Sequence, residues 1–303
     1  MSEKLKDIGE FGLIERIRKK IRVDASVFKG IGDDAAILKP KAGEEILLTT
    51  DILIEGHDFR LKEATPYEIG RKALAINLSD IAAMGGVPKH AVIAIGMPAH
   101  LPIRFVQELY RGIGDLARQF KVNIVGGDTS ASEKIVLSVA VMGYGKAKSA
   151  VLRSGAKMGD VIFVTGTLGG SYASKKHLNF VPRISEAQFL VKNFKIHAMM
   201  DISDGLASDI HRITKASDVG AVIFKAQIPV SRHAKSIEAA LTEGEDFELL
   251  FTLSTAEAER LMKMKPKKFL PVGRIVSKAK GVMIVDEKGR VKPLTEKGFD
   301  HFR

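Results

Sequence analysis

The stretch TPYEIGRKALAINLSDIAAMGG, residues 65–86, predicts a helix whose two ends are both marked in the sequence. Thr65 offers a capping hydroxyl, Pro66 stands at the first helical position, and Glu68 completes a capping box. The pattern then continues at helical spacing until two glycines, at 85–86, end it. This helix is the best marked element of the chain, and the segments on either side are interpreted from it.

Strand patterns and helix patterns alternate on both sides of this helix. Such alternation is typical of a mixed fold, so we expect the α/β or α+β class. We expect strands at 35–38, 46–50, 90–96, 123–125, 134–142, 161–165, 220–224 and 247–253, and further helices at 8–21, 102–120, 185–194, 203–215 and 232–241.

The chain is long enough for two domains, because its 303 residues exceed the usual size of one. A glycine-rich stretch at 143–149 separates two series of strands and helices. We therefore predict an N-terminal domain over 1–148 and a C-terminal domain over 149–303.

Composition excludes several classes of protein. The chain has no cysteine, which excludes disulfides, thiolate metal sites and cysteine nucleophiles. No secretory leader or bilayer-spanning segment is evident, so we expect a cytoplasmic location and no membrane partner. The net charge of +11 raises the question of nucleic acid. However, the basic C-terminal region lacks interleaved aromatic residues, so we expect solvated surface and no nucleic-acid partner.

Aspartates beside glycine, serine or threonine are the informative feature of the sequence. Any one of them is explained by ordinary turn or cap chemistry. Together they predict a set of oxygen ligands, and carboxylates that gather in one place repel each other unless cations lie between them. The pattern therefore indicates magnesium. The motifs contain Asp33 and Asp34, Thr49-Thr50-Asp51, Asn77 and Asp80, Gly127-Asp128, Asp201 with Ser203 and Asp204, and Gly244-Glu245-Asp246.

The common phosphate motifs are absent or unsuitable. The P-loop pattern with its lysine does not occur. Residues 30–35 match the spacing of a dinucleotide-binding turn, but they place two adjacent carboxylates where a pyrophosphate would lie. A nucleotide must therefore be held in another way.

Taken together and in this order, the motifs resemble those of the thiamine-monophosphate kinase family, which is part of the aminoimidazole-ribonucleotide-synthetase-like superfamily of ATP-binding proteins. The resemblance covers nearly the whole chain. The segments that carry it are GIGDDAAIL at 30–38, TTD at 49–51, AINLSDIAAMGG at 75–86, VGGDTS at 125–130, RSG at 153–155, MDISDGL at 200–206, GEDFELLF at 244–251 and GFDHF at 298–302.

The resemblance implies a two-domain fold whose N-terminal domains pair through their sheets into a homodimer. It also implies ATP as co-substrate, several Mg²⁺ ions, and transfer of a phosphoryl group from ATP to thiamine monophosphate. We expect that transfer to be direct and in line, because the acceptor phosphate is already largely ionised and needs no general base.

The resemblance further assigns residues to roles. It implies that Asp80, Asp128 and Asp204 are catalytic. The implied metal ligands are Asp33, Thr49, Thr50, Asp51, Asp80, Asp128, Asp201 and Asp204; the implied ATP contacts are Tyr110, Gly127, Asp128, Arg153 and Ser203; and the implied substrate contacts are Asp58, Asp246 and Phe299.

Two of these assignments stay open. The family usually has a histidine two residues after the Glu-Gly pair at 55–56, whereas this chain has His57 one place early, so either His57 or Asp58 is the contact. In the acidic motif, Glu245, Asp246 and Glu248 are all candidates, and we favour Asp246.

Alternative activities also stay open. Within the superfamily, an aminoimidazole-ribonucleotide-synthetase type of ligase is the second candidate, whereas the members that use a reactive cysteine are disfavoured by its absence. From another class, a non-catalytic nucleotide-binding or nucleic-acid-binding protein would leave the aspartates unexplained.

Overall fold

The computed structural model describes residues 16–29, 37–38, 43–146, 150–264 and 268–299, and these form two compact units. Unit 1 consists of Met1–Ile81 and Gly86–Lys148, and unit 2 of Ala82–Gly85 and Ser149–Arg303. No helix within the described ranges is both long enough and apolar enough to cross a lipid bilayer.

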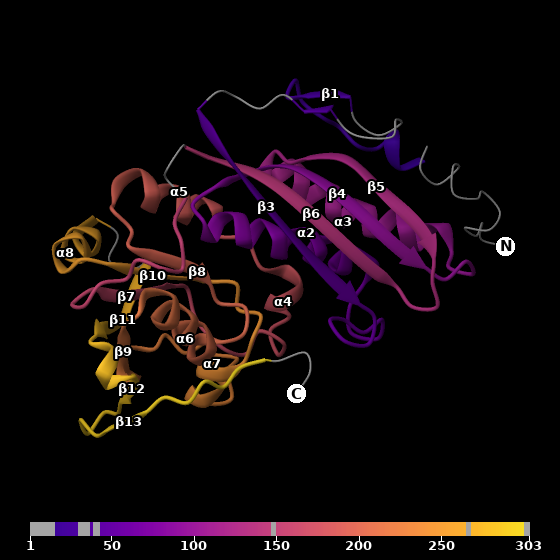
Figure 1. Cartoon of the computed structure of the whole chain (residues 1–303). Helices are drawn as coiled ribbons and strands as arrows, with labels where there is room; N and C mark the ends of the chain where they lie inside the picture. Colours follow the sequence, from indigo (N-terminus) through magenta and orange to yellow (C-terminus); the bar gives the residue numbers. More distant parts are fainter. Residues whose placement is uncertain (1–15, 30–36, 39–42, 147–149, 265–267, 300–303) are drawn as a thin grey trace. The chain divides into compact units, whose positions relative to one another are not determined.

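Unit 1 is a four-stranded sheet with two helices against one face (Figure 1). The strand order is β3-β6-β4-β5, in which only the β4 and β5 pair is parallel. A separate two-stranded sheet is formed by β1 and β2. The elements are β1 Val27–Lys29, β2 Ile37–Leu38, β3 Glu44–Ile54, α2 Pro66–Ala83, β4 Val87–Met97, α3 Ile103–Phe120, β5 Asn123–Ala131 and β6 Val136–Lys146.

The predicted capping box at the start of α2 is confirmed. The Thr65 backbone N–H donates to the Glu68 carboxylate at 2.8 Å, and the Glu68 N–H donates to the Thr65 hydroxyl at 3.3 Å. Two donors at the helix start, where no intrahelical partner exists, are thereby satisfied.

Helices α2 and α3 touch through their backbones. A Cβ on Gly70 of α2 would lie 2.0 Å from the carbonyl oxygen of Leu109, and one on Gly112 of α3 would lie 2.0 Å from that of Tyr67. Only glycine fits at either position, because a heavy atom at that distance overlaps the carbonyl oxygen. The two glycines therefore set the close approach of the helices.

The two faces of the unit 1 sheet differ in what covers them. On β3, Leu47 and Leu53 are buried on the helix side, whereas Leu48 and Ile52 on the other side are 75% and 53% exposed. The pairing register extends this second face across β6 to Val92 on β4. We call it the open sheet face; its exposed apolar residues are Ile46, Leu48, Ile52, Val87 and Val92.

Unit 2 is built on a seven-stranded mixed sheet of order β13-β12-β9-β11-β7-β10-β8. All its pairs are antiparallel except β9 with β12. The mixed α/β class expected from the sequence is confirmed. The strands are β7 Val161–Thr165, β8 Ala198–Asp201, β9 Gly220–Phe224, β10 Leu249–Leu253, β11 Phe269–Val276, β12 Val282–Val285 and β13 Val291–Pro293; the helices are α4 Lys176–Asn179, α5 Ile184–Asn193, α6 Leu206–Ser217, α7 Ile237–Thr242 and α8 Thr255–Met264, with short 3₁₀ helices at Lys225–Gln227 and Lys278–Lys280.

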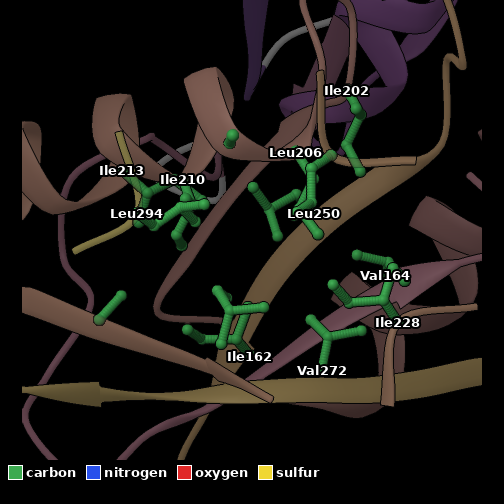
Figure 2. Close-up of a cluster of buried hydrophobic side chains, with 14 of the residues drawn as sticks. Ile162, Val164, Ile202, Leu206, Ile210, Ile213, Ile228, Leu250, Val272 and Leu294 are labelled. Carbon is green, nitrogen blue, oxygen red and sulfur yellow. The ribbon is translucent and has the colours of Figure 1, made fainter. Parts of the chain in front are cut away.

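The core of unit 2 lies under the start of α6. Leu206, Ile210 and Ile213 recur at helical spacing on one side of α6 and are fully buried against the sheet. Figure 2 shows Leu206 beside Ile202 and Leu250, at the point where β8 leads into α6. The turn that carries the unit 2 aspartates is therefore anchored on packed apolar residues.

Several element boundaries differ from the sequence-based expectation. Strand β5 continues beyond the expected 123–125 through the motif at 125–130, and β6 continues beyond the expected 134–142 into the glycine-rich residues 143–146, so both strands extend further than predicted. The helix expected at 232–241 begins only at Ile237, where Ser236 accepts the Ala239 N–H. Strand β8, helices α4 and α8 and the three last strands were not anticipated, and residues 8–15 of the first expected helix lie outside the described residues.

Candidate active site

Three of the predicted metal ligands of unit 1 come together on the helix side of the sheet. Thr49 and Asp51 share a face of β3, and the Thr49 hydroxyl donates to the Asp80 carboxylate of α2 at 2.6 Å. All three side chains are half-buried. We call Thr49, Asp51 and Asp80 the covered-face group.

Helix α2 also carries two buried polar side chains, Lys72 and Asn77. The Asn77 amide nitrogen donates to the Ala73 carbonyl oxygen at 3.1 Å, while its Oδ1 atom is buried without a hydrogen bond, one turn before Asp80. Lys72 is fully buried, and its ammonium donates to the Asp58 carbonyl oxygen at 3.0 Å. Lys72 was missed at the sequence level; a lysine within the apolar run KALAINL is the signal that could have found it.

Two other predicted metal ligands lie on the opposite side of the sheet. Thr50 alternates with Thr49 and Asp51, and its hydroxyl donates to the Val139 carbonyl oxygen at 3.1 Å. Asp128 is exposed on β5 beside Ala94, and its carboxylate accepts the Thr129 N–H at 2.8 Å. The structure therefore does not bring the side chains of Thr50 and Asp128 into the covered-face group.

A small cavity brings together three of the predicted ATP contacts. It has a volume of about 50 Å³, and Tyr110, Gly127 and Asp128 all line it. A Cβ on Gly127 would lie 2.0 Å from the Ile93 carbonyl oxygen, so only glycine fits at this position of β5. Burial raises the pKa of the Tyr110 phenol. The phenol therefore stays neutral at physiological pH.

A larger basic groove adjoins this cavity, since Tyr110 and Ile17 line both. Its volume is about 620 Å³. Its wall combines apolar residues of α3 with six cationic side chains and a single acidic one, Glu108. The groove therefore suits an anionic ligand that also has an apolar part. The cationic residues are Arg16, Lys19, Lys20, Arg22, Arg111 and Arg118.

In unit 2, the predicted residues gather at the turn between β8 and α6. Asp201 is buried, and Ser203 and Asp204 are half-buried. Gly205 has φ of +105°, a conformation that glycine adopts readily. The turn thus directs successive polar residues to one end of the sheet.

Asp209 and Arg212 of α6 complete this polar end, and both were missed at the sequence level. The Arg212 guanidinium pairs with Asp204 and donates to Asp209 at 2.9 Å. Burial, and then the charge of Asp204, raise the pKa of Asp209 to about 8. Their spacing of three residues on one helix face is the signal that could have found the pair.

The acidic motif forms a turn, residues 243–248, which we call the acid turn. The sequence placed 247–248 in a strand, but β10 begins only at Leu249 because Phe247 has φ of +50°. Asp246 and Glu248 are fully buried, whereas Glu245 is half-buried. The Asp246 carboxylate has no exposed surface in this conformation, and its role as a substrate contact stays a prediction.

The C-terminal segment brings Phe299 to the same place. The Phe299 N–H donates to the Asp204 carbonyl oxygen at 3.1 Å, and a Cβ on Gly244 would lie 3.4 Å from the Phe299 Cβ. The Phe299 side chain is 46% exposed. Phe299, Asp204 and the acid turn therefore lie together.

Two predicted contacts lie apart from these clusters. Arg153 is exposed near the far end of α6, where its carbonyl oxygen accepts the Ser217 hydroxyl at 3.2 Å. In unit 1, the Asp58 carboxylate accepts the Ile54 N–H at 2.7 Å and closes a turn in which His57 is exposed. The structure leaves the choice between His57 and Asp58 open.

The donor chemistry of the covered-face group fits magnesium. Its atoms are carboxylate and hydroxyl oxygens, and the buried Asn77 Oδ1 is a further acceptor with no hydrogen bond. In the described part of the chain, no three Asp, Glu or His side chains converge as a metal site would require. Asp33, the remaining predicted ligand, lies outside the described residues.

Family models match most of the chain. Residues 32–147 match the N-terminal domain of AIR synthase related protein, and residues 157–286 match its C-terminal domain.

Curated relatives are similar over nearly their full lengths. The thiamine-monophosphate kinase of Bacillus subtilis is 35% identical, with 97% of this chain and 99% of that protein covered. The thiamine-monophosphate kinase of Aquifex aeolicus is also 35% identical, with coverage of 99% and 100%. That of Escherichia coli K12 is 34% identical, with coverage of 97% and 98%.

Solved structures show the same similarity. Thiamine-monophosphate kinase from Stenotrophomonas maltophilia has a TM-score of 0.81 at 32% identity, covering 91% of this chain and 96% of that one. A structure described as AaThiL complexed with AMPPCP and TMP has a TM-score of 0.76 at 33% identity and covers both chains fully. Escherichia coli HypE, a hydrogenase maturation protein, shares the fold, with a TM-score of 0.79 at 18% identity over 96% of this chain and 98% of that one.

Proposed function

Because this chain belongs to the thiamine-monophosphate kinase family, we propose that it transfers the γ-phosphoryl group of ATP to thiamine monophosphate and releases thiamine diphosphate and ADP. The observation that carries the proposal is the cavity in which Tyr110, Gly127 and Asp128 meet. The solved relative at 33% identity is described as a complex with AMPPCP and TMP, which supports ATP and thiamine monophosphate as the substrates here.

The nucleotide lies along unit 1 in this proposal. Tyr110 lines both the small cavity and the basic groove. If the base and ribose of the nucleotide lie beside Tyr110, its phosphates reach either Gly127 in the cavity or the cationic wall of the groove. The missing side chain at Gly127 lets the ligand approach the β5 backbone closely. We expect the phosphates at the Gly127 end, where the β5 backbone is open to a ligand. The Asp128 carboxylate lies on the other side of the sheet in this conformation, so its role as a metal ligand stays a prediction.

The residues that would hold magnesium are Thr49, Asp51 and Asp80 in unit 1, with Asp128 beside the nucleotide, and Asp201 and Asp204 in unit 2. When bound, Mg²⁺ supplies positive charge that screens the repulsion between the donor and acceptor phosphates. Thr50, whose side chain lies on the other side of the sheet, and Asp33, which lies outside the described residues, stay predicted ligands.

Catalysis by the chain itself then consists of positioning. In unit 1, Asp80 and Asp128 are the proposed catalytic carboxylates. In unit 2, Asp204 is the third, Ser203 and Arg153 are proposed nucleotide contacts, and Phe299 and the acid turn are proposed to bind the thiamine part. An aromatic ring beside carboxylates suits the cationic thiazolium ring of the acceptor. A phosphate monoester has a second pKa of about 6, so its oxygen attacks without a general base. The transfer is direct, and no residue is phosphorylated.

The decisive experiment measures ADP release with ATP and Mg²⁺. Three reactions are compared: thiamine monophosphate, formylglycinamidine ribonucleotide, and no acceptor. Release that requires thiamine monophosphate supports the proposal, and release with the ribonucleotide alone would assign the chain to the synthetase type. A covalently phosphorylated protein that forms and decays at the turnover rate would contradict direct transfer.

The functional unit is a homodimer in this proposal, paired through the open sheet face. Ile46, Leu48 and Ile52 of β3 expose 57%, 75% and 53% of their surface and form one apolar row with Val92. A contiguous exposed apolar face of this kind is typical of a protein interface. Sedimentation analysis of Leu48→Glu tests it: the variant should sediment as a monomer, with Leu61→Glu, an exposed leucine outside the sheet, as the control.

A further inference from the structure

The acid turn has a conformation that its sequence does not favour. Glu245 and Phe247 have φ of +63° and +50°, a region that residues with a side chain rarely adopt. Two such residues within three positions are costly, and they persist only where surrounding contacts determine the backbone. The contacts around residues 243–248 therefore indicate what the turn is built to do.

One side of the turn is held by backbone and hydroxyl donors of residues 169–171. The Gly169 N–H donates to the Asp246 carboxylate at 2.7 Å, and the Gly170 N–H donates to that of Glu243 at 2.6 Å. The Ser171 hydroxyl donates to the Glu245 carbonyl oxygen at 2.6 Å. Three consecutive residues thus hold three residues of the turn.

Two cations hold the buried carboxylates from the same side. Arg183 donates to both oxygens of Glu248, each at 2.7 Å, and the Lys176 ammonium lies 2.8 Å from Glu248 and 3.5 Å from Asp246. The Thr165 hydroxyl adds a fourth bond to Glu248 at 2.7 Å. With four donors on two oxygens, Glu248 has no capacity left for a ligand.

The other side of the turn is bonded to the aspartate turn between β8 and α6. The Glu245 N–H donates to the Ser203 carbonyl oxygen at 2.6 Å, and the Phe247 N–H donates to that of Ile202 at 2.8 Å. The Ile202 N–H in turn donates to the Glu248 carbonyl oxygen at 2.7 Å. Whatever fixes the acid turn therefore also fixes the backbone beside Ser203 and Asp204.

We propose that Arg183 and Lys176 are positioning residues for the thiamine part of the substrate: by occupying Glu248 and Asp246 they hold the acid turn in its left-handed conformation, beside Phe299. The inference rests on the proposed function. Neither cation touches a reacting atom in this arrangement. They act through the two buried acids, and their removal should weaken acceptor binding while the unit 1 contacts to the nucleotide remain.

The test compares Lys176→Met, Lys176→Arg and Arg183→Lys with the wild-type chain in steady-state kinetics. Lys176→Met and Arg183→Lys should raise the KM for thiamine monophosphate by about tenfold or more, as removal of a residue that orients a ligand-binding group generally does. The KM for ATP should stay within about twofold. Lys176→Arg keeps the charge and should recover most of the lost affinity.

Lys278→Met is the matched control. Lys278 also pairs with a carboxylate, Asp218 at 2.5 Å, but Asp218 follows the last residue of α6, whereas the acid turn is bonded to the residues before its first. Lys278→Met should leave both KM values unchanged. Titration calorimetry measures the affinity for thiamine monophosphate in the absence of turnover. Lys176→Met and Arg183→Lys should bind it more weakly than the wild type, and Lys176→Arg should bind it nearly as well.

The outcomes separate the two hypotheses. A wild-type chain that releases no ADP with thiamine monophosphate would contradict the proposed function. An active wild type whose Lys176→Met and Arg183→Lys variants keep the ratio of the two KM values, with only a lower melting temperature, would overturn the positioning role. If Arg183→Lys does not fold, the two Lys176 variants decide, since the Lys176 side chain is 23% exposed and its loss leaves the Arg183 pair intact.

Discussion

The covered-face group of unit 1 and the acid turn of unit 2 place carboxylates in opposite ways. Asp80 stands on a regular helix and Asp51 on a regular strand, and one hydroxyl, that of Thr49, bridges strand and helix. In the acid turn the backbone is irregular. The Gly169 N–H and the Lys176 ammonium hold Asp246, and the side chains of Thr165 and Arg183 hold Glu248. Secondary structure therefore positions the covered-face group, whereas the acid turn depends on its own ion pairs. Substitution should therefore affect function with little loss of stability in unit 1, whereas in the acid turn of unit 2 it should affect stability as well as acceptor binding.

The largest expected effect is on the stability of unit 2. Glu248→Gln removes the charge that compensates Arg183 and Lys176 in a buried site. Breaking a buried pair from one side costs about 3–5 kcal/mol in free energy of unfolding. Urea denaturation at neutral pH measures it. A loss below about 1 kcal/mol would mean that the acid turn does not depend on these pairs.

The pH dependence of the free energy of unfolding gives a second test of how the acid turn is held. Burial raises the pKa of Asp246 to about 6 from its ordinary value of 3.8, although Lys176 opposes the change. Between those values the folded chain binds a proton that the unfolded chain has released, so the free energy of unfolding falls as pH rises through this window. The fall is on the order of 3 kcal/mol.

The corresponding variant is Asp246→Asn. Denaturation at pH 4, 5, 6 and 7 should show a smaller decrease for the variant than for the wild type. Equal slopes for the two chains would show that Asp246 ionises normally.

In unit 1 the effect should appear in activity. Asp80→Asn keeps the shape and the bond from Thr49 but removes a proposed metal ligand, so kcat should fall about hundredfold or more. The free energy of unfolding should change by less than about 1 kcal/mol, because the side chain is half-buried and lies on an intact helix. Parallel kinetics and denaturation check both parts. Asp115→Asn is the control, because its half-buried carboxylate on α3 likewise accepts a hydroxyl, that of Tyr67 at 3.1 Å, but is not a proposed ligand. A large loss of stability in Asp80→Asn would contradict the difference expected between the units.

The smallest effect is expected at an exposed pair of unit 2. Glu257→Gln disrupts the contact with Arg260, 2.7 Å away on α8, where water screens both charges. The free energy of unfolding should change by about 0.5 kcal/mol or less. A change comparable with that of Glu248→Gln would show that burial is not what separates the two kinds of pair.

The sequence predicted those features that depend on neighbouring residues. The capping box of Thr65 and Glu68 involves residues three apart, so α2 was located correctly at both ends. The mixed fold followed from alternating patterns of the same short range. Six aspartate motifs were recognised, but their division between the two sides of the sheet was not, because β5 extends through the glycines that suggested a turn.

Contacts between distant residues account for what was missed. Glu248 meets Arg183, which is 65 positions earlier, and no local pattern relates the two. Phenylalanine favours strands, yet Phe247 has a positive φ. Its ring stacks on that of Phe180, with 4.1 Å between the ring centroids, so tertiary packing overrides the local preference. The burial of Asp246 follows from the same contacts and could not be deduced from its neighbours.

The reciprocal glycines of α2 and α3 have a mechanical consequence. Where Gly70 and Gly112 lie, the helices meet backbone to backbone with no side chain between them to yield. At such a contact neither helix can move toward the other. Tyr110 stands two positions from Gly112, and Asp80 stands on the same helix as Gly70. A nucleotide that pushes α3 toward α2 should therefore also shift the helix that carries Asp80, so that filling one end of the proposed site affects the other.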